Sequence, residues 1–239
     1  MSSEYLRLYE TFPQPCSYLA GRENTAIVTD PAHPISTMEY AVLMDQGFRR
    51  SGGNFYRPHC RGCDACVSVR IPVLDFRPRR GQRRIWQRNQ DLQVQVETPH
   101  FHIAHWQLYQ KYQHGRHAGG GMDTDSLEDY ERFVLDSPVE TWLVSFRTSE
   151  RLLAVSVVDV LPQGMSAVYT FYDPEEQHRG LGVHAVLWQV QRARELGLPY
   201  VYLGYWIAEC DKMAYKTQYQ PLEGWIAGNW QAVPDHRKT

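Results

Sequence analysis

Cysteine side chains in one short segment offer the clearest metal chemistry in the 239-residue sequence. Cys60, Cys63 and Cys66 follow one another at C-x-x-C spacing, and Cys16 supplies a fourth thiol. Four converging thiolates would complete a tetrahedral zinc site or hold an iron–sulfur cluster. The same residues could equally be reduced, partly buried thiols, and spacing alone does not choose between the two interpretations. Cys210 stands far away in the sequence, and we expect it in the core or lining a site.

Arginine side chains give residues 47–90 a strongly basic character, with eleven arginines against two acidic residues, although the whole chain carries a net charge of −2. Arginine outnumbers lysine 21 to 4, which favours planar, bidentate contact with phosphate. RNA fits this segment better than duplex DNA, because we find no helix-turn-helix or zinc-finger pattern. A solvated surface helix is the alternative. The predicted nucleic-acid contacts are Arg77, Arg79, Arg80, Arg83, Arg84, Trp86 and Arg88.

A glycine-containing loop, EEQHRGLG, occupies residues 175–182 between a strand-like run and a helical stretch. Gly180 and Gly182 permit a tight turn, so that N–H groups at the helix start can face an anionic group, with Gln177 beside them. An ordinary turn before a helix would explain the same residues. The runs before the loop look like hairpins, which excludes a dinucleotide-binding fold. We therefore predict a binding loop for the phosphates of a donor molecule.

Hydrophobic patterns define the elements that must position these groups. In residues 1–90 we expect loops, short strands, a helix near 36–46 with a capping box of Ser36 and Glu39, and a basic helix over 77–90. In residues 91–239 we expect strands at 91–97, 141–146, 151–161, 165–173 and 199–205 and helices at 101–113, 125–135 and 183–196, followed by a frayed tail.

The order of meander, loop, helix and strand in the second half resembles the acyltransferase fold of the GCN5-related N-acetyltransferase superfamily. We predict a mixed α+β protein with two regions, a smaller Cys/Arg-rich one at 1–90 and an acyltransferase-like one at 91–239. Two further segments could line its cleft, RHAGGGM at 116–122 and LGYWIAECDKMAYK at 203–216. The sequence has no basic, apolar leader and no apolar run long enough for a bilayer, which favours a cytoplasmic protein without membrane contact.

Several segments together resemble the bacterial aspartate/glutamate leucyltransferases, relatives of the arginyl-tRNA-protein transferases. They are CSYL (16–19), GFRRSGGNFYRPHCRGCDACVSVRIPV (47–73), FRPRRGQRR (76–84), RHAGGGM (116–122), FYDPE (171–175) and LGYWIAECDKMAYKTQYQPLE (203–223). The resemblance covers nearly the whole chain. One departure is the run Arg179-Gly180-Leu181-Gly182, because the family often has serine before Leu-Gly.

The resemblance implies an enzyme that moves leucine from leucyl-tRNA to the free N-terminal amine of proteins beginning with Asp or Glu, marking them for N-end rule degradation. Transfer would need no cofactor, whereas Cys16, Cys60, Cys63 and Cys66 would be a possible zinc or iron–sulfur site. The arginine-rich stretch and the loop would hold the tRNA. The acidic acceptor would meet Arg57, Arg61, Arg116, His117 or Lys216, and the candidates for catalysis are Tyr172, Asp173, Tyr205 and Lys212.

Three other functions remain open on the sequence alone. They are arginyl transfer from tRNA, N-acetylation that depends on an acyl-coenzyme A donor, and RNA binding without catalysis. The first differs only in the donor amino acid. The second would leave the arginine-rich segment and the cysteines without a purpose. The third predicts tRNA affinity without acyl transfer. Neither the general base nor the oligomeric state follows from the sequence.

Overall fold

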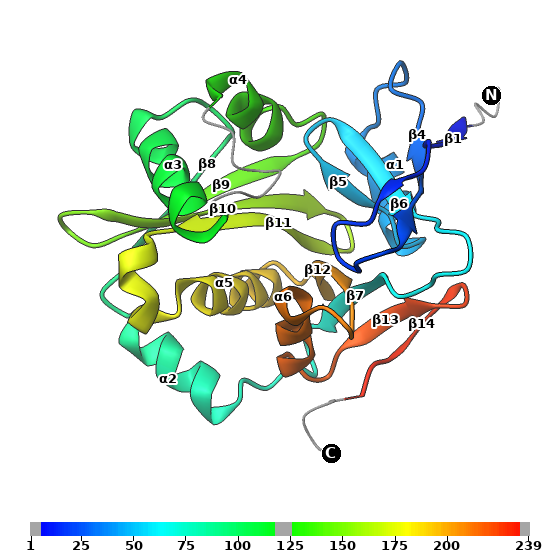
Figure 1. Cartoon of the computed structure of the whole chain (residues 1–239). Helices are drawn as coiled ribbons and strands as arrows, with labels where there is room; N and C mark the ends of the chain where they lie inside the picture. Colours follow the sequence, from blue (N-terminus) through cyan, green and yellow to red (C-terminus); the bar gives the residue numbers. More distant parts are fainter. Residues whose placement is uncertain (1–5, 118–125, 235–239) are drawn as a thin grey trace.

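An eight-stranded mixed sheet forms the centre of the molecule in the computed structural model, which describes residues 6–117 and 126–234 (Figure 1). From edge to edge its strands are β14 (Asn229–Ala232), β13 (Glu223–Ile226), β7 (Val67–Pro72), β12 (Tyr200–Trp206), β11 (Gly164–Tyr172), β10 (Leu152–Leu161), β9 (Thr141–Arg147) and β8 (Gln93–Glu97). Every neighbouring pair is antiparallel except β11 and β12. The predicted mixed α+β class and the meander of β9, β10 and β11 are confirmed.

Helices cover both faces of this sheet (Figure 1). One face carries α5 (Leu181–Glu195), whose apolar side chains join those of β7, β10 and β12 in the largest core cluster. The other face carries α3 (Ile103–His117), α4 (Leu127–Tyr130) and the π-helix η1 (Glu131–Leu135), packed on β9, β10 and β11. Between β11 and α5 lies the short 3-10 helix η2 (Pro174–Arg179), and β12 is followed by α6 (Asp211–Ala214) and η3 (Tyr215–Gln218).

The amino-terminal residues form a smaller sheet and one helix beside the large sheet. The smaller sheet consists of β1 (Leu8–Glu10), β4 (Ala26–Thr29), β6 (Asn54–Pro58) and β5 (Arg49–Ser51), and β2 (Gln14–Pro15) pairs separately with β3 (Glu23–Asn24). Helix α1 (Thr37–Asp45) starts with the predicted capping box, in which Ser36 Oγ accepts from the backbone N–H of Glu39 and the Glu39 carboxylate accepts from that of Ser36. Strand β7 leaves this region and enters the middle of the large sheet. The large sheet therefore draws on both of the predicted regions.

The basic segment forms α2 (Arg80–Arg88), within the predicted range of 77–90. Two other expectations are wrong. Helix α3 continues past Gln113 to His117, because Gly115 packs against η2: a Cβ there would lie only 2.9 Å from Pro174 Cγ. The tail expected to fray contains β14, whose Trp230 ring lies 5.6 Å from that of Trp225 in β13. Both elements are fixed by contacts distant in sequence, which local patterns do not reveal.

Within residues 6–117 and 126–234, no helix combines the length and the apolar character needed to cross a membrane.

Candidate active site

Strands β11 and β12 are paired over only part of their length. Parallel pairing joins Gly164–Ser166 of β11 to Tyr200–Tyr202 of β12, and both strands continue beyond it. The register between β12 and β7 shifts just before Gly204, whose φ of +78° favours glycine. The two parallel strands therefore separate toward their carboxyl ends. Such a separation exposes the middle of a sheet to ligands, as at the switch points of other α/β sheets.

The loop that follows β11 carries the predicted binding glycines. Gly180 has a φ of +65° and ends η2, and a Cβ on it would lie 3.0 Å from Ile85 Cδ1 of α2. Glycine is therefore required both by the turn and by the close approach of α2. Helix α5 begins without a side-chain cap, and its first hydrogen bond runs from His184 N–H to the Gly180 carbonyl. The N–H groups of residues 181–183 thus have no carbonyl partner within the helix and favour an anion at this end.

Helix α2 is fixed to this loop at its carboxyl end. The Asn89 side chain donates to the Arg179 carbonyl at 2.9 Å, and the Arg88 guanidinium donates to the His178 carbonyl. The Arg179 side chain binds the Asp91 carboxylate at 2.9 and 3.0 Å, so it helps to attach α2 and is not free for a donor molecule. The structure therefore brings together the two segments that the sequence predicts to hold the donor. Five of the six predicted arginines are exposed, Arg77, Arg80, Arg83, Arg84 and Arg88, and Arg79 is half-buried.

A pocket of about 250 Å³ lies between α2 and α5, close to this attachment. Trp86, Arg83 and Gln87 of α2 face Leu187, Gln191 and Arg194 of α5 across it, with Phe76, Pro78 and Val190 completing the lining. The Trp86 ring is partly buried and lies 5.2 Å from the ring of His184. Burial lowers the pKa of His184 to about 4, so its ring is neutral at pH 7. The pocket combines an aromatic surface with two cations, which suits a planar, anionic ligand.

Two of the predicted catalytic residues lie at the carboxyl end of β11. Tyr172 is its last residue, and Asp173 follows directly. The Tyr172 ring packs against Tyr112 with centroids 4.9 Å apart, and a Cβ on Gly182 would lie 3.6 Å from Tyr172 Cε1. Asp173 binds Lys111 at 2.8 Å and accepts from the Glu175 N–H. Burial tends to raise the pKa of Asp173, but these contacts outweigh it and hold the pKa below its ordinary value. Asp173 is thus a weak base that caps η2, whereas Tyr172 lies beside the loop.

The other two predicted catalytic residues, Tyr205 and Lys212, differ in burial. The Tyr205 hydroxyl lies 3.0 Å from the carbonyl oxygens of both Gly47 and Tyr56, which share its single O–H as acceptors, and burial raises its pKa well above the ordinary value. Tyr205 therefore supports the fold and is a poor proton acceptor. Lys212 is exposed on α6.

The predicted acceptor residues do not form one cluster. Arg57 donates to the Gln46 carbonyl at 2.8 Å and stacks on Phe48, and Arg61 is exposed in the cysteine-rich turn. Arg116 and His117 are in the last turn of α3, but their side chains lie outside the described residues, as do Ala118–Met122 of the predicted glycine segment. Lys216 is 5% exposed and donates to the carbonyl of Tyr205. Burial and the nearby charge of Arg49 lower the pKa of Lys216 to about 7.

Arg49 is a residue that the sequence analysis missed. It is 4% exposed, donates to the Phe48 carbonyl, and lies over the rings of Tyr202 and Tyr205 at 5.2 and 5.9 Å. Neither Arg49 nor Lys216 has a carboxylate within ion-pair distance in the part of the chain that the structure describes. Two neighbouring cations without a carboxylate are costly to bury, and the lowered pKa of Lys216 reflects that cost. The sequence shows only the pair Arg49-Arg50 between Phe48 and Ser51, and burial could not be deduced from it.

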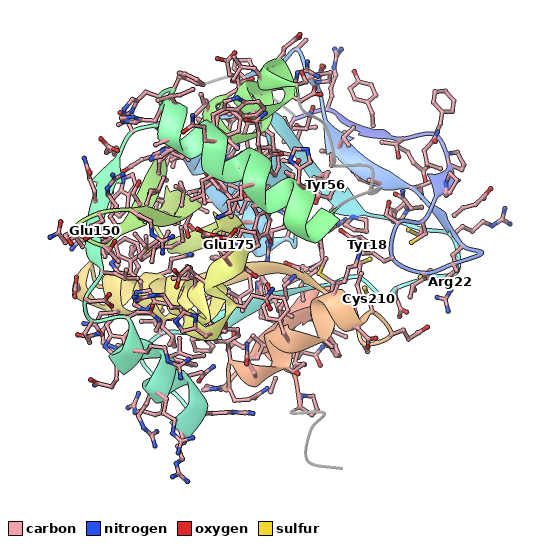
Figure 2. The ribbon with its side chains drawn as sticks, turned by 60° about the vertical axis from the view of Figure 1, so that its left-hand side comes forward. Tyr18, Arg22, Tyr56, Glu150, Glu175 and Cys210 are labelled. Carbon is pink, nitrogen blue, oxygen red and sulfur yellow. The ribbon has the colours of Figure 1, made fainter. Side chains whose placement is uncertain are left out.

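The cysteines lie near one another without converging on a point. Burial raises the pKa of the Cys66 thiol to about 11. The negative charges of nearby thiolates raise it further, and these thiolates belong to Cys60, Cys16, Cys63 and Cys210. Cys210, which we expected in the core or lining a site, is buried and lies near these cysteines. Figure 2 shows Tyr18, Arg22 and Cys210 on the same side of the molecule. All five are free thiols.

Three of the thiols already have hydrogen-bond partners. Arg22 donates to Cys63 Sγ at 3.2 Å, the Leu19 N–H donates to Cys16 Sγ at 3.4 Å, and Cys60 donates to the Thr25 carbonyl at 3.5 Å. Among the described residues no three cysteine sulfurs lie within 4.8 Å of one another. The donor chemistry fits a thiophilic metal, but the ligand set is not preassembled, so one ion would require the loops to move inward.

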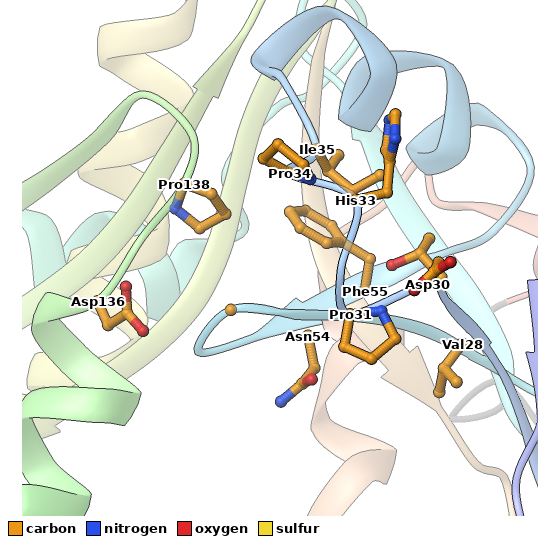
Figure 3. A pocket seen from close by; sticks show the side chains of 12 residues that line it. Val28, Asp30, Pro31, His33, Pro34, Ile35, Asn54, Phe55, Asp136 and Pro138 are labelled. Atoms are coloured by element: carbon orange, nitrogen blue, oxygen red, sulfur yellow. The ribbon is translucent and has the colours of Figure 1, made fainter. Parts of the chain in front are cut away.

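A second pocket, of about 240 Å³, opens between the smaller sheet and the segment before β9 (Figure 3). Asp30, His33, Asn54 and Asp136 supply polar groups to its wall, beside apolar residues such as Ile35 and Phe55. None of the residues predicted from the sequence lines it. It is therefore separate from the donor-side pocket of α2 and α5.

Comparison with protein families gives two matches that divide the chain. Residues 14–84 match the model described as arginine-tRNA-protein transferase, N terminus, and residues 104–226 match the one described as arginine-tRNA-protein transferase, C terminus. The first match contains all four of the clustered cysteines and most of the arginine-rich segment, and the second contains the loop and α5.

Curated relatives match over almost the full length of both chains. Aspartate/glutamate leucyltransferase from Chromobacterium violaceum is 50% identical over 96% of this chain and 95% of its own length. Aspartate/glutamate leucyltransferase from Pseudomonas aeruginosa (strain LESB58) is 49% identical over 95% and 97%, and the one from Hahella chejuensis is 47% identical over the same shares.

Solved structures resemble the chain only distantly. L-PGS from Bacillus licheniformis is 15% identical with a TM-score of 0.45, covering 70% of this chain and 49% of its own. FemX is 10% identical with a TM-score of 0.44, covering 84% and 79%.

Proposed function

The chain belongs to the arginine-tRNA-protein transferase family, and on that premise we propose that it transfers leucine from leucyl-tRNA to the free α-amino group of proteins that begin with Asp or Glu. One observation carries the proposal: the aspartate/glutamate leucyltransferases reported above are 47–50% identical to it over 95% of the chain or more. Their name supports leucine rather than arginine as the donor. The N-terminal leucine would mark the acceptor protein for N-end rule degradation.

Mass spectrometry of peptides tests the proposal directly. One peptide begins with Asp and a matched one with acetylated Asp, and each is incubated with the protein and tRNA charged with leucine or arginine. We expect a mass gain of one leucyl residue on the free amine alone. A gain only with arginyl-tRNA would correct the donor. No gain with either, despite tight tRNA binding, would favour an RNA-binding module without catalysis.

We assign the donor to the face formed by α2 and the loop that precedes α5. The exposed arginines of α2 would contact phosphates near the acceptor end of the tRNA, and the free N–H groups of residues 181–183 would face its last phosphate or the ester. Trp86 in the pocket between α2 and α5 would stack a terminal base. The attachment of α2 to Arg179 and His178 supports this assignment, because it fixes the phosphate contacts relative to the loop.

We assign the acceptor to the separation between β11 and β12, where the amine can reach the ester held at the loop. The amine nitrogen attacks the leucyl carbonyl, the ester bond to the ribose oxygen breaks, and the proton lost by nitrogen ends on that oxygen. Lys216, with a pKa of about 7, is suited to carry this proton at neutral pH. Arg49 beside it would attract the acidic side chain of the acceptor through its uncompensated charge.

Transfer itself would need no cofactor, because the ester is already activated. A zinc ion or iron–sulfur cluster on Cys16, Cys60, Cys63 and Cys66 stays a separate proposal, supported by the proximity of the thiols. Such a group would hold the amino-terminal loops together and would add a structural link. Anaerobic purification, metal analysis and an absorbance scan test it. Less than one equivalent of metal and no cluster band would identify the cysteines as structural thiols.

A further inference from the structure

Three metal-ligating side chains meet where β8 leads into α3. Glu97 is the last residue of β8, and His100 and His102 follow in the connection to α3. One ligand atom from each lies within 4.8 Å of the other two, which is true of no other three described Cys, His, Asp or Glu side chains. The Glu97 Oε2 atom lies 4.0 Å from His102 Nε2. This place is on the edge strand of the large sheet, outside the donor and acceptor assignments and the cysteine group.

Hydrogen bonds leave the ligand atoms of two of these residues available. Glu97 Oε1 accepts from the Gln95 side chain at 3.0 Å, which leaves Oε2 toward His102. His100 Nδ1 lies 2.8 Å from the Thr98 carbonyl, which can only accept. Nδ1 must therefore carry the proton, and Nε2 of His100 has its lone pair free for a metal. A ligand imidazole is commonly fixed by such a bond from its other nitrogen to a carbonyl.

A fourth histidine gives an independent indication of a missing ligand. His105 is 3% exposed, and its ring lies 4.9 Å from the ring of His102. Its Nε2 is 3.0 Å from Ser145 Oγ, whereas its Nδ1 is buried without a hydrogen-bond partner among the described residues. Buried polar atoms normally have a partner, so an orphaned nitrogen beside a Glu-His-His group needs an explanation.

We propose that Glu97, His100 and His102 bind a divalent transition-metal ion of the zinc class, with His105 Nδ1 as the fourth ligand. Two imidazoles and a carboxylate are a ligand set that zinc accepts, and imidazole favours zinc over magnesium or calcium. The nitrogen and oxygen atoms must move inward, because the ligands of one zinc ion lie about 3.3 Å apart at bond lengths near 2.0 Å. His100 and His102 are exposed and can make this movement. The Glu97 carboxylate would attract the ion, whereas the positive charge of Arg147 near His105 would oppose it.

Such an ion would connect the edge strand β8 to α3 and so close one end of the sheet. The experiment is a titration of the full chain with Zn²⁺, followed through the imidazole nitrogens by ¹⁵N-histidine NMR. This measurement separates uptake by histidines from uptake by the cysteines. We expect one equivalent of zinc to shift the signals of His100, His102 and His105, with the affinity falling at least tenfold in His102→Gln.

His33→Gln is the matched control. His33 Nε2 lies 3.0 Å from Glu39 Oε1, so it forms a closer Glu-His pair than that of Glu97 and His102, but no second histidine accompanies it in a described metal-ligating group. This variant should bind zinc as the parent does. Both replaced side chains are at least partly exposed, and equal far-UV circular dichroism would show that both variants fold. Zinc uptake without a shift of these histidines, or equal affinity in His102→Gln, would overturn the proposal.

Discussion

Two adjacent arginines of β5 lie in different electrostatic environments. Arg50 is buried and forms a bidentate ion pair with Asp159 of β10, at 2.9 Å from Nε and 2.6 Å from Nη2. Arg49 is equally buried, but carbonyl groups, a thioether and aromatic rings surround it, without a carboxylate among the described residues. The side chains of successive strand residues point to opposite faces, so one strand places the two charges in two different cores.

The difference separates a structural charge from one that is available to a ligand. Asp159 neutralises Arg50 and also accepts from Thr141 Oγ1 at 2.7 Å. Arg50 therefore needs no negative charge from a substrate. Arg49 and its neighbour Lys216 remain uncompensated, at a cost in stability that a purely structural site would not require. An acidic acceptor would supply the missing negative charge. The comparison thus predicts that replacing Asp159 affects folding and that replacing Arg49 or Lys216 affects the reaction.

The largest effect is expected for Asp159→Asn. Removing one partner of a buried pair leaves the other charge uncompensated, which costs about 3 to 5 kcal/mol in the free energy of unfolding. Urea denaturation measures it. The control is Asp91→Asn, because Asp91 binds Arg179 in a pair that is partly exposed and should cost about 1 kcal/mol or less. Equal losses in the two variants would break the distinction between a buried and an exposed pair.

Lys216→Met tests the charge that the comparison calls uncompensated. The folded pKa of Lys216 is lowered to about 7 from 10.5, so between these pH values the unfolded chain binds a proton that the folded chain lacks. The destabilisation is therefore complete below pH 7 and is relieved as the pH rises toward 10.5. The methionine variant should exceed the parent in stability most at pH 6.5, by a margin about 2 kcal/mol smaller at pH 9.

The control for this pH dependence is Lys111→Met. Lys111 binds Asp173 and Glu175, and these carboxylates raise its pKa above the ordinary value. Its protonation is then the same in both states from pH 6.5 to 9, so the difference in stability from the parent should stay constant. A constant difference for Lys216→Met as well would mean that Lys216 is charged in the folded protein at pH 9.

Local patterns were sufficient to predict most of the carboxyl-terminal half. Runs rich in Val, Tyr and Phe predicted β9, β10 and β11, and Gly180 and Gly182 predicted the turn into α5, because strand propensity and glycine turns depend on residues close together in the chain. The arginine-rich helix was found in the same way. Its attachment to the loop was not predicted, because it depends on Asn89 and Arg88 meeting carbonyls 90 residues away.

The site residues that sequence analysis missed are defined by burial. Arg49 looks like any other arginine of residues 47–90, and only the packing of Tyr202 and Tyr205 around it sets it apart. The same limit explains Cys210, which approaches Cys66 because the residues before α6 lie beside the cysteine-rich turn. It also explains Tyr205, which the sequence offers as a candidate for catalysis but whose hydroxyl lies 3.0 Å from two carbonyl oxygens in the fold.

Arg49→Met should lower transfer to Asp-starting peptides more than it alters folding. Loss of a charged contact to the acceptor corresponds to a 10- to 100-fold fall in kcat/KM, mostly through KM, while the free energy of unfolding stays equal or rises. Steady-state kinetics with leucyl-tRNA measures the first and urea denaturation the second. Arg132→Met is the control, because the Arg132 guanidinium is exposed and pairs with Glu128 and Asp129, away from the assigned acceptor position. A loss of stability without a change in KM would place Arg49 with Arg50 among the structural charges.

The smallest effect on binding is expected for arginines of α2. Their side chains are exposed to solvent, so they carry no cost of burial. Replacing Arg83 and Arg84 with glutamine should weaken tRNA binding about tenfold near physiological salt and reduce the slope of log K against log salt by between one and two, since each phosphate contact contributes about 0.7 to 0.9. Filter binding at several salt concentrations measures both. Replacing Arg132 and Arg192, which pair with Glu128 and Glu195 on other helices, removes the same charge. If both pairs of replacements changed the slope equally, tRNA binding would depend on net charge alone. That result would contradict the assignment of the donor to α2.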